Sequence, residues 1–278
     1  MSLSYYEGDW PSSSSQRLSY RFWQPPEARA LVVIIHGFGE HSGRYQPVAE
    51  ALAERGIAVA APDLWGHGRS SGARGDIKDV GRCARDVALM SAQVFRPLAG
   101  HDWYVLFGHS FGGLVAIRLA LDSPDGLRRL IIQSPLLKAG FPIPAWKITT
   151  AKLLAKIWPT ASFSTALPVE ALSRDPDVLE AYQADPLVHH VMSARAYQAV
   201  RQASDDVMAR AAGLSIPTLL LYGTEDRIVS IELALRWFER LRCDKRRVEF
   251  PGAYHELHHE PVRAEVLRLI QEWTFTNA

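Results

Sequence analysis

The sequence predicts an α/β fold in which helices cover both faces of a mainly parallel central sheet and a helical cap is inserted. Short apolar segments typical of strands alternate with amphipathic helical segments along most of the 278 residues, as in parallel sheets. One strand joins a helix through a G-x-S-x-G turn at residues 108–112. The alternation stops between residues 135 and 214, where prolines stand at positions 142, 144, 159, 168, 176 and 186. We therefore expect a core of residues 1–134 and 215–278 and a cap, or lid, of residues 135–214.

The elements of the first half follow from the length and spacing of the apolar runs. Residues 31–35 and 57–61 are continuously apolar and short, as strands buried on both faces are. Residues 45–55 and 79–95 are longer and amphipathic, which predicts helices.

The remaining elements flank the cap. Residues 103–107 form an apolar strand that leads through the G-x-S-x-G turn into a helix at 114–121, and a strand at 130–133 precedes the cap. After the cap we expect a strand at 218–222, a helix at 231–241, a strand at 247–250 and a helix at 262–273.

Composition and charge exclude several classes of function. The net charge is +1 with acidic and basic residues interleaved, so we expect no nucleic-acid partner. Cys83 and Cys243 have no C-x-x-C spacing and are expected to be free thiols in a reducing compartment. Residues 1–16 lack the pattern of a signal peptide, and no run reaches the ~20 apolar residues of a membrane span. These features predict a cytoplasmic protein. They do not indicate whether the protein is a monomer or an oligomer.

Ser110, at the centre of the G-x-S-x-G turn, is the expected nucleophile. A strand-to-helix turn of this kind strains the serine backbone and exposes its Oγ. Serine is inert near neutral pH unless a base takes its proton and an acid orients that base. Asp226 lies four residues beyond Tyr222, and His255 lies five beyond Phe250, both after predicted strands. We expect Asp226 as the acid, with Glu225 as the alternative, and His255 as the base; taken alone, each would be an ordinary turn or loop residue.

An acyl-transfer site also needs hydrogen-bond donors for the oxyanion. One donor is expected from the backbone N–H of Phe111, directly after the nucleophile. The loop at residues 34–39, rich in glycine, supplies the N–H of Phe38 as the second donor. A plain turn is the alternative interpretation of this loop.

Residues 255–259 spell H-E-x-x-H, which is the signature of a zinc peptidase. That chemistry requires a continuous helix with both histidines on one face, whereas Gly252 and Pro261 flank this segment closely. Only Glu265 and Glu272 follow as third ligands. We therefore expect no metal and no cofactor, and we expect His189 and His190 in the cap to be a solvated pair.

Taken together, these residues resemble the monoacylglycerol lipase group of the α/β-hydrolase superfamily, also called lysophospholipase-like, from about residue 21 to 273. The resemblance rests on His36-Gly37-Phe38-Gly39-Glu40-His41-Ser42-Gly43-Arg44-Tyr45, Asp63 with Gly66-His67-Gly68-Arg69-Ser70, Gly108 to Gly113, Asp185-Pro186-Leu187, and Gly252-Ala253-Tyr254-His255 with His258.

The resemblance implies an α/β-hydrolase fold, the Ser110, Asp226 and His255 triad, and a long-chain acyl ester of glycerol as substrate. It also implies that Glu40, Arg44 and His258 hold the glycerol head, with Tyr182 of the cap as a further candidate. A surface ion pair is the alternative interpretation of Glu40 and Arg44. Val229 stands where animal members carry a cysteine, so sensitivity to thiol reagents is not expected.

One helix of the cap is amphipathic and basic. At 100° per residue, one side of it carries Trp146, Thr150, Leu153, Leu154 and Ile157, and the opposite side carries Thr149, Lys152 and Lys156. Such a helix can lie on a lipid surface while its apolar side shapes an acyl tunnel. We expect transient contact of the cap with a membrane surface; the alternative is that the helix buries its apolar side on its own domain.

The function we expect is cleavage of medium- or long-chain monoacylglycerol to glycerol and fatty acid, through an acyl-serine intermediate. A lysophospholipase or a general carboxylesterase would use the same chemistry with another head group. A non-catalytic receptor with a hydrolase fold and a zinc peptidase are the more distant alternatives.

Overall fold

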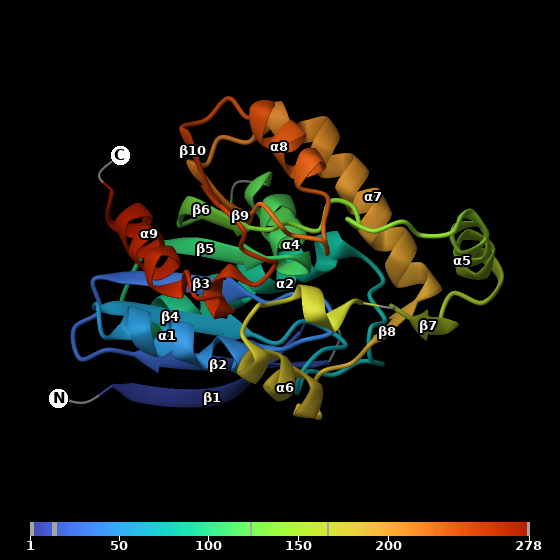
Figure 1. Ribbon diagram of the computed structural model, residues 1–278. Helices are drawn as coiled ribbons and strands as arrows, with labels where there is room; N and C mark the ends of the chain where they lie inside the picture. The colour runs from blue at the N-terminus through green and yellow to red at the C-terminus, as the bar shows by residue number, and fades with distance from the viewer. Residues whose placement is uncertain (1–2, 13–15, 123, 166, 277–278) are drawn as a thin grey trace.

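The central sheet is mainly parallel, as predicted. The computed structural model describes residues 3–12, 16–122, 124–165 and 167–276. In these residues eight strands form a sheet in the order β1-β2-β4-β3-β5-β6-β9-β10 (Figure 1). The strands from β4 to β10 in this order run parallel to one another. They are β3 (Ala30–Ile35), β4 (Ile57–Pro62), β5 (Tyr104–His109), β6 (Leu127–Gln133), β9 (Thr218–Gly223) and β10 (Lys245–Phe250).

Two strands at the N-terminal end were not predicted. β1 (Ser4–Pro11) pairs antiparallel with β2 (Arg17–Gln24), and β2 pairs antiparallel with β4. Most side chains of β1 are exposed because it is an edge strand, so it lacks the apolar run that marks a buried strand. The predicted sheet therefore lacks the N-terminal hairpin that β1 and β2 form. Residues 13–15 of the polar N-terminal stretch lie outside the described residues.

The helices lie close to their predicted positions. They are α1 (Gln46–Ala53), α2 (Val80–Met90), α3 (Arg96–Ala99), α4 (Phe111–Ala120), α5 (Ala145–Ile157), α6 (Pro176–Ala184), α7 (Ala194–Arg210), α8 (Ile231–Glu239) and α9 (Arg263–Phe275). The helix predicted at 79–95 instead passes from α2 through a π-helical turn, Ser91–Phe95, into α3. α4 begins directly after Ser110 rather than at residue 114.

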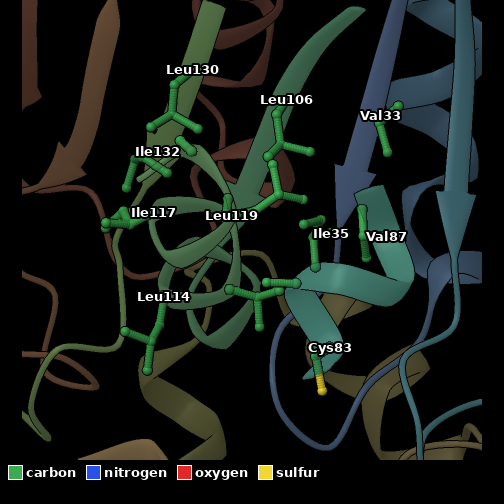
Figure 2. Close-up of a cluster of buried hydrophobic side chains, with 14 of the residues drawn as sticks. Val33, Ile35, Cys83, Val87, Leu106, Leu114, Ile117, Leu119, Leu130 and Ile132 are labelled. Carbon is green, nitrogen blue, oxygen red and sulfur yellow. The ribbon is translucent and has the colours of Figure 1, made fainter. Parts of the chain in front are cut away.

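Alternate residues of the strands fill two cores, one on each face of the sheet. In β3, Val33 belongs to one cluster and Val32 to the other. Figure 2 shows side chains of the first cluster, among them Leu106 of β5, Leu130 of β6 and Leu114 of α4. This cluster also includes side chains of α2 and α7, and the second includes side chains of α1 and α9. The predicted covering of both faces by helices is confirmed.

The segment between β6 and β9 adds no strand to the main sheet. It holds α5, α6 and α7 together with a small antiparallel pair, β7 (Ser162–Ser164) and β8 (Val191–Ser193). The prediction that this stretch is helical throughout is therefore wrong for these two short strands. α7 buries a row of alanines in the main core, whereas α5 lies at the right edge of the molecule, away from the sheet (Figure 1).

Candidate active site

Ser110 occupies a strained turn between β5 and α4. Its φ of 52° and ψ of −117° lie in a backbone region that residues other than glycine rarely adopt. The backbones are close enough here to require glycine, because a Cβ on Gly112 would lie 2.1 Å from the Ile35 carbonyl oxygen and one on Gly108 would lie 2.5 Å from the Gly112 oxygen. This turn places Ser110 on the wall of a large cavity.

Parallel strands bring the predicted site loops to one edge of the sheet. Phe38 follows β3, Ser110 follows β5, Asp226 follows β9 and His255 follows β10. Because these strands are parallel, their carboxyl ends meet at the same edge. All four residues line the same cavity.

Asp226 and His255 form a buried hydrogen-bonded pair. His255 Nδ1 donates to Asp226 Oδ2 over 2.8 Å, and the two side chains are 2% and 0% exposed. The other carboxylate oxygen accepts the N–H groups of Ile228 and Val229 at 2.9 and 3.1 Å. Glu225, the alternative acid, is exposed on the same loop. The geometry thus favours Asp226 as the group that orients His255.

Burial and charge shift the pKa values of Asp226 and His255 in opposite directions. Burial alone would lower the pKa of His255, but the Asp226 carboxylate outweighs it and the pKa lies above its usual value. Burial alone would raise the pKa of Asp226, yet His255 and the backbone N–H groups hold it below its usual value. Asp226 is therefore ionised near neutral pH and stabilises a protonated His255.

His36 orients the peptide that carries the predicted Phe38 donor. His36 Nδ1 donates to the Gly37 carbonyl at 2.7 Å, and its Nε2 accepts the Leu64 N–H at 3.0 Å. In a trans peptide the C=O and N–H point in opposite directions. With the Gly37 carbonyl held by His36, the Phe38 N–H points away from that ring. Phe111 supplies the first N–H of α4, where backbone donors are free for an anion.

The head-group candidates Glu40 and Arg44 lie in a buried network rather than at the surface. Arg44 Nη1 donates to Glu40, and Nη1 and Nη2 donate to the two oxygens of Glu256 at 2.7 Å each. Glu40 also accepts the Gly37 N–H at 2.5 Å and the Tyr45 hydroxyl at 2.9 Å. The surface ion pair that was the alternative interpretation is excluded by this burial, since Glu40 is 3% exposed.

Glu256 is a site residue that the sequence did not indicate. It lines the cavity next to His255, although the Arg44 side chain does not. Burial alone would raise its pKa, but the Arg44 guanidinium holds the pKa well below its usual range. The only sequence signal was its position in the H-E-x-x-H string, which pointed to a different chemistry.

That string does not form the helix that a zinc peptidase requires. Residues Leu257–His259 make a single 3₁₀ turn, and His255 and His259 contact different partners, Asp226 and Glu256. Among the ranges described, no three histidine, cysteine or acidic side chains are grouped as metal ligands.

His258 lies behind the catalytic pair and not on the cavity wall. Its Nδ1 is 2.8 Å from the Gln133 side-chain nitrogen, which is also 3.0 Å from His109 Nδ1. The His109 ring lies 4.7 Å from that of His255. The predicted contact of His258 with a glycerol head therefore stays a prediction, whereas His109 and Gln133 are neighbours of the site that the sequence did not indicate.

The segment between β6 and β9, predicted to be a cap, contributes many of the residues that line the cavity. The cavity has a volume of about 1470 Å³ and is lined from the cap by apolar side chains such as Phe141, Ile148, Leu154, Val200 and Met208. Tyr182, the cap candidate for the head group, also lines it and lies with its ring 4.7 Å from the Arg44 guanidinium carbon. His189 lies against the Phe38 ring at 5.8 Å and is part of the cavity wall, so it is not a solvated histidine as predicted.

Most of the apolar stripe of α5 faces solvent. Trp146, Leu153 and Ile157 are 67%, 56% and 70% exposed, although Leu154 lines the cavity. The alternative that α5 buries this whole stripe on its own domain is therefore wrong. Within the part of the chain that is described, no helix is both long and apolar enough to cross a bilayer.

Comparison with known proteins points to the same group of hydrolases as the sequence. The family model Hydrolase_4, described as serine aminopeptidase, S33, matches residues 26–262. The chain is 36% identical over 259 residues to a monoglyceride lipase homolog of monkeypox virus, covering 92% of this chain and 93% of the relative. It is 32% identical over 267 residues to a monoacylglycerol lipase of Mycolicibacterium smegmatis, covering 92% of each.

The solved structures agree. The monoacylglycerol lipase of Paleococcus ferrophilus superposes with a TM-score of 0.83 at 35% identity, over 99% of this chain and 98% of that one. The predicted α/β-hydrolase fold and the resemblance to monoacylglycerol lipases are confirmed by these matches.

Proposed function

The chain belongs to the Hydrolase_4 family of serine hydrolases, and from this membership we propose that it cleaves medium- or long-chain monoacylglycerol to glycerol and fatty acid. The observation that carries the proposal is the buried His255–Asp226 pair, which shares with the strained Ser110 a cavity of about 1470 Å³. That cavity exceeds the ~300–1,000 Å³ typical of small-ligand pockets and has room for an acyl chain.

In the proposed mechanism His255 takes the proton of the Ser110 hydroxyl while Oγ attacks the ester carbonyl carbon. The carbonyl oxygen becomes an oxyanion that accepts hydrogen bonds from the Phe38 and Phe111 N–H groups. The carbon–oxygen bond to glycerol breaks, and His255 returns the proton to the glycerol oxygen. Water, deprotonated by His255, then attacks the acyl-serine and releases the fatty acid and free Ser110. Asp226 stabilises the protonated ring in both halves of the reaction.

We assign residues 135–214 to a cap that shapes the acyl site and meets the lipid surface. The exposed side chains of Trp146, Leu153 and Ile157 form an apolar ridge on α5, and Lys152 and Lys156 of the same helix are also exposed. An amphipathic helix with exposed apolar side chains and lysines suits an interface with anionic headgroups. Contact at this ridge would bring the cavity mouth to the membrane in which the substrate lies.

A substrate panel tests the proposed function. Wild-type protein is assayed on 1-oleoylglycerol, on lysophosphatidylcholine with the same acyl chain, and on alanine p-nitroanilide, since the family description includes an aminopeptidase. We expect the highest kcat/KM on the monoacylglycerol. Faster turnover of the anilide would establish a peptidase, and faster turnover of lysophosphatidylcholine would establish a lysophospholipase; either result contradicts the proposal.

A further inference from the structure

Glu256 is a second acidic residue in the lining of the cavity that holds Ser110. The residue is 2% exposed, follows His255 directly, and lines the cavity together with Glu40. The guanidinium between the two carboxylates belongs to Arg44, which lies behind them and does not line the cavity. The lining of the cavity therefore includes the two acidic residues but not the arginine.

Both terminal nitrogens of Arg44 already donate to carboxylates. Nη1 contacts both Glu40 Oε2 and Glu256 Oε1, and Nη2 contacts Glu256 Oε2 and, at 3.4 Å, His259 Nδ1. The face of the guanidinium lies over the Tyr182 ring. Each terminal nitrogen carries two N–H bonds, and three of these four bonds are directed at carboxylate oxygens. A phosphate would have to break these charged hydrogen bonds to reach Arg44.

Both carboxylates keep an acceptor position. A carboxylate has about four lone-pair sites. Among the described residues, Glu40 has three hydrogen-bonding neighbours: Gly37 N and the Tyr45 hydroxyl on Oε1, and Arg44 on Oε2. Glu256 likewise has three, with Arg44 on each oxygen and His259 Nδ1 at 2.9 Å from Oε2. The less occupied oxygens, Glu40 Oε2 and Glu256 Oε1, share one neighbour, Arg44 Nη1, and so lie next to each other.

We propose that Glu256 is a specificity-determining residue that, with Glu40, accepts hydrogen bonds from two hydroxyls of the leaving alcohol. The site would thus select esters of polyols that keep two free hydroxyls, and it would reject a head group that carries phosphate. The inference rests on the proposed function, because glycerol is such a polyol. Of the head-group residues that the resemblance implies, it keeps Glu40, adds Glu256, and leaves Arg44 as the partner of both carboxylates.

Charge supports the same selection. Two carboxylates face one guanidinium, so the wall next to Ser110 carries an excess of negative charge over the arginine. Hydroxyl groups are hydrogen-bond donors to carboxylates, whereas a phosphate offers these oxygens only acceptors and a like charge. In a buried site such a repulsion is weakly screened.

Variants of Glu256 test the proposal. The kcat/KM of wild type and Glu256→Gln is measured on 1-oleoylglycerol, on methyl oleate, which has no hydroxyl, and on 1-oleoylglycerol 3-phosphate. A hydrogen bond to a charged group is strong enough that Glu256→Gln should lower kcat/KM on 1-oleoylglycerol about tenfold or more. On methyl oleate, kcat/KM should fall less than about twofold. The ratio of kcat/KM on 1-oleoylglycerol 3-phosphate to kcat/KM on 1-oleoylglycerol should rise.

Glu260→Gln is the matched control. Glu260 is a buried carboxylate of the same loop that pairs with Arg174 and does not line the cavity. Its replacement should leave the ratio of the rates on 1-oleoylglycerol and methyl oleate unchanged. An equal loss on both substrates in Glu256→Gln, or no loss on either, would overturn the role of Glu256.

A second measurement needs no variant and applies even if Glu256→Gln fails to fold. Wild-type protein is assayed on oleoyl esters of glycerol, of propane-1,2-diol and of propane-1,3-diol, so that one hydroxyl is removed at a time. Removal of either hydroxyl should cost about tenfold in kcat/KM. A cost below twofold for both diols would overturn the two-hydroxyl site while leaving monoacylglycerol hydrolysis intact. Turnover of methyl oleate without turnover of 1-oleoylglycerol would instead overturn the proposed function.

Discussion

At the residue scale, the pKa values of two neighbouring buried histidines, His109 and His255, are shifted in opposite directions. Burial lowers the pKa of His109 to about 3, while the Asp226 carboxylate raises the pKa of His255 above its usual value against the effect of burial. The two rings lie 4.7 Å apart. In the proposed mechanism, the proton taken from Ser110 should therefore go to His255 and not to His109.

The pH profile of kcat/KM follows from this tuning. His255 must be neutral to accept the Ser110 proton, and its pKa is raised, so activity should be lost below that pKa and should rise with pH through an ionisation above ~6.5. Steady-state rates on 1-oleoylglycerol between pH 5 and 9 measure it. An ionisation well below 6.5 would show that His255 is not the base.

Replacement of the acid should have a large effect. Asp226→Asn keeps the shape of the side chain but removes the charge that stabilises protonated His255, and loss of the equivalent charge in a serine protease triad costs about 10⁴-fold in kcat. We expect a fall of about that size, with little change for Glu225→Gln, whose side chain is exposed. The reverse pattern would make Glu225 the acid.

Glu40 has a second role besides the leaving alcohol. It accepts the Gly37 N–H, one peptide before the Phe38 donor, so Glu40→Gln weakens a charged hydrogen bond that positions the oxyanion loop. We expect kcat on p-nitrophenyl butyrate, which has no glycerol, to fall roughly fivefold. Glu256→Gln should leave that rate nearly unchanged, and an equal fall in both variants would contradict this division of roles.

The sequence predicted some parts of the site better than others. That Ser110, Asp226 and His255 line one cavity could be predicted because each follows an apolar strand and parallel strands end at one edge. Glu256 could not, because its partner Arg44 is more than 200 positions away and no local pattern links them. The proposed role of Glu256 depends on which residues of the Arg44 network line the cavity, and spacing along the chain does not encode this.

At the element scale, α5 behaves as a surface element and β5 as a core element. Leu153 is 56% exposed on α5, whereas Leu106 of β5 is completely buried. Leu106→Ala should lower the free energy of unfolding by about 2–5 kcal/mol, and Leu153→Ala should change it by less than about 0.5 kcal/mol. Urea denaturation of both variants measures the contrast, and similar losses would place Leu153 in the core.

The apolar ridge of α5 should control binding to lipid surfaces. The triple variant Trp146→Ser, Leu153→Ser, Ile157→Ser should bind anionic vesicles about tenfold or more weakly, since burial of even one such side chain is worth ~1.5–3 kcal/mol. Turnover of a dissolved short-chain ester should be unaffected.

Leu98→Ser is the control for this variant, because Leu98 is 46% exposed on α3, outside the cap. It should leave vesicle binding unchanged. Equal vesicle affinity of wild type and the triple variant would show that the ridge does not meet the membrane.

Elements at the edge of the fold were the hardest to predict. β1 was missed because an edge strand buries few side chains, β2 because polar residues interrupt its apolar ones, and β7 and β8 because each is only three residues long. The strands at the centre, such as β3, were predicted because all their side chains are buried and apolar.

At the scale of the whole molecule, the proposed cap is hydrogen-bonded to the loops that carry the candidate site residues. His189 N–H donates to the Gly39 carbonyl of the oxyanion loop at 2.8 Å, and His41 Nε2 donates to Asp185 of the cap at 2.8 Å. On the other side, the Glu256 N–H donates to the Leu172 carbonyl at 2.8 Å. The cap is thus fixed beside the reacting groups, and α5 is the part of it that projects outward.

The central claim is that Ser110 forms the acyl intermediate of monoacylglycerol hydrolysis. Its most direct test is to trap that serine with a fluorophosphonate, map the adduct by peptide mass spectrometry, and assay Ser110→Ala on 1-oleoylglycerol. We predict one adduct, on Ser110, and a loss of about 10⁴-fold or more in kcat for a correctly folded variant, because triad members act as a unit. An adduct on another residue, or substantial turnover by Ser110→Ala, would contradict the claim.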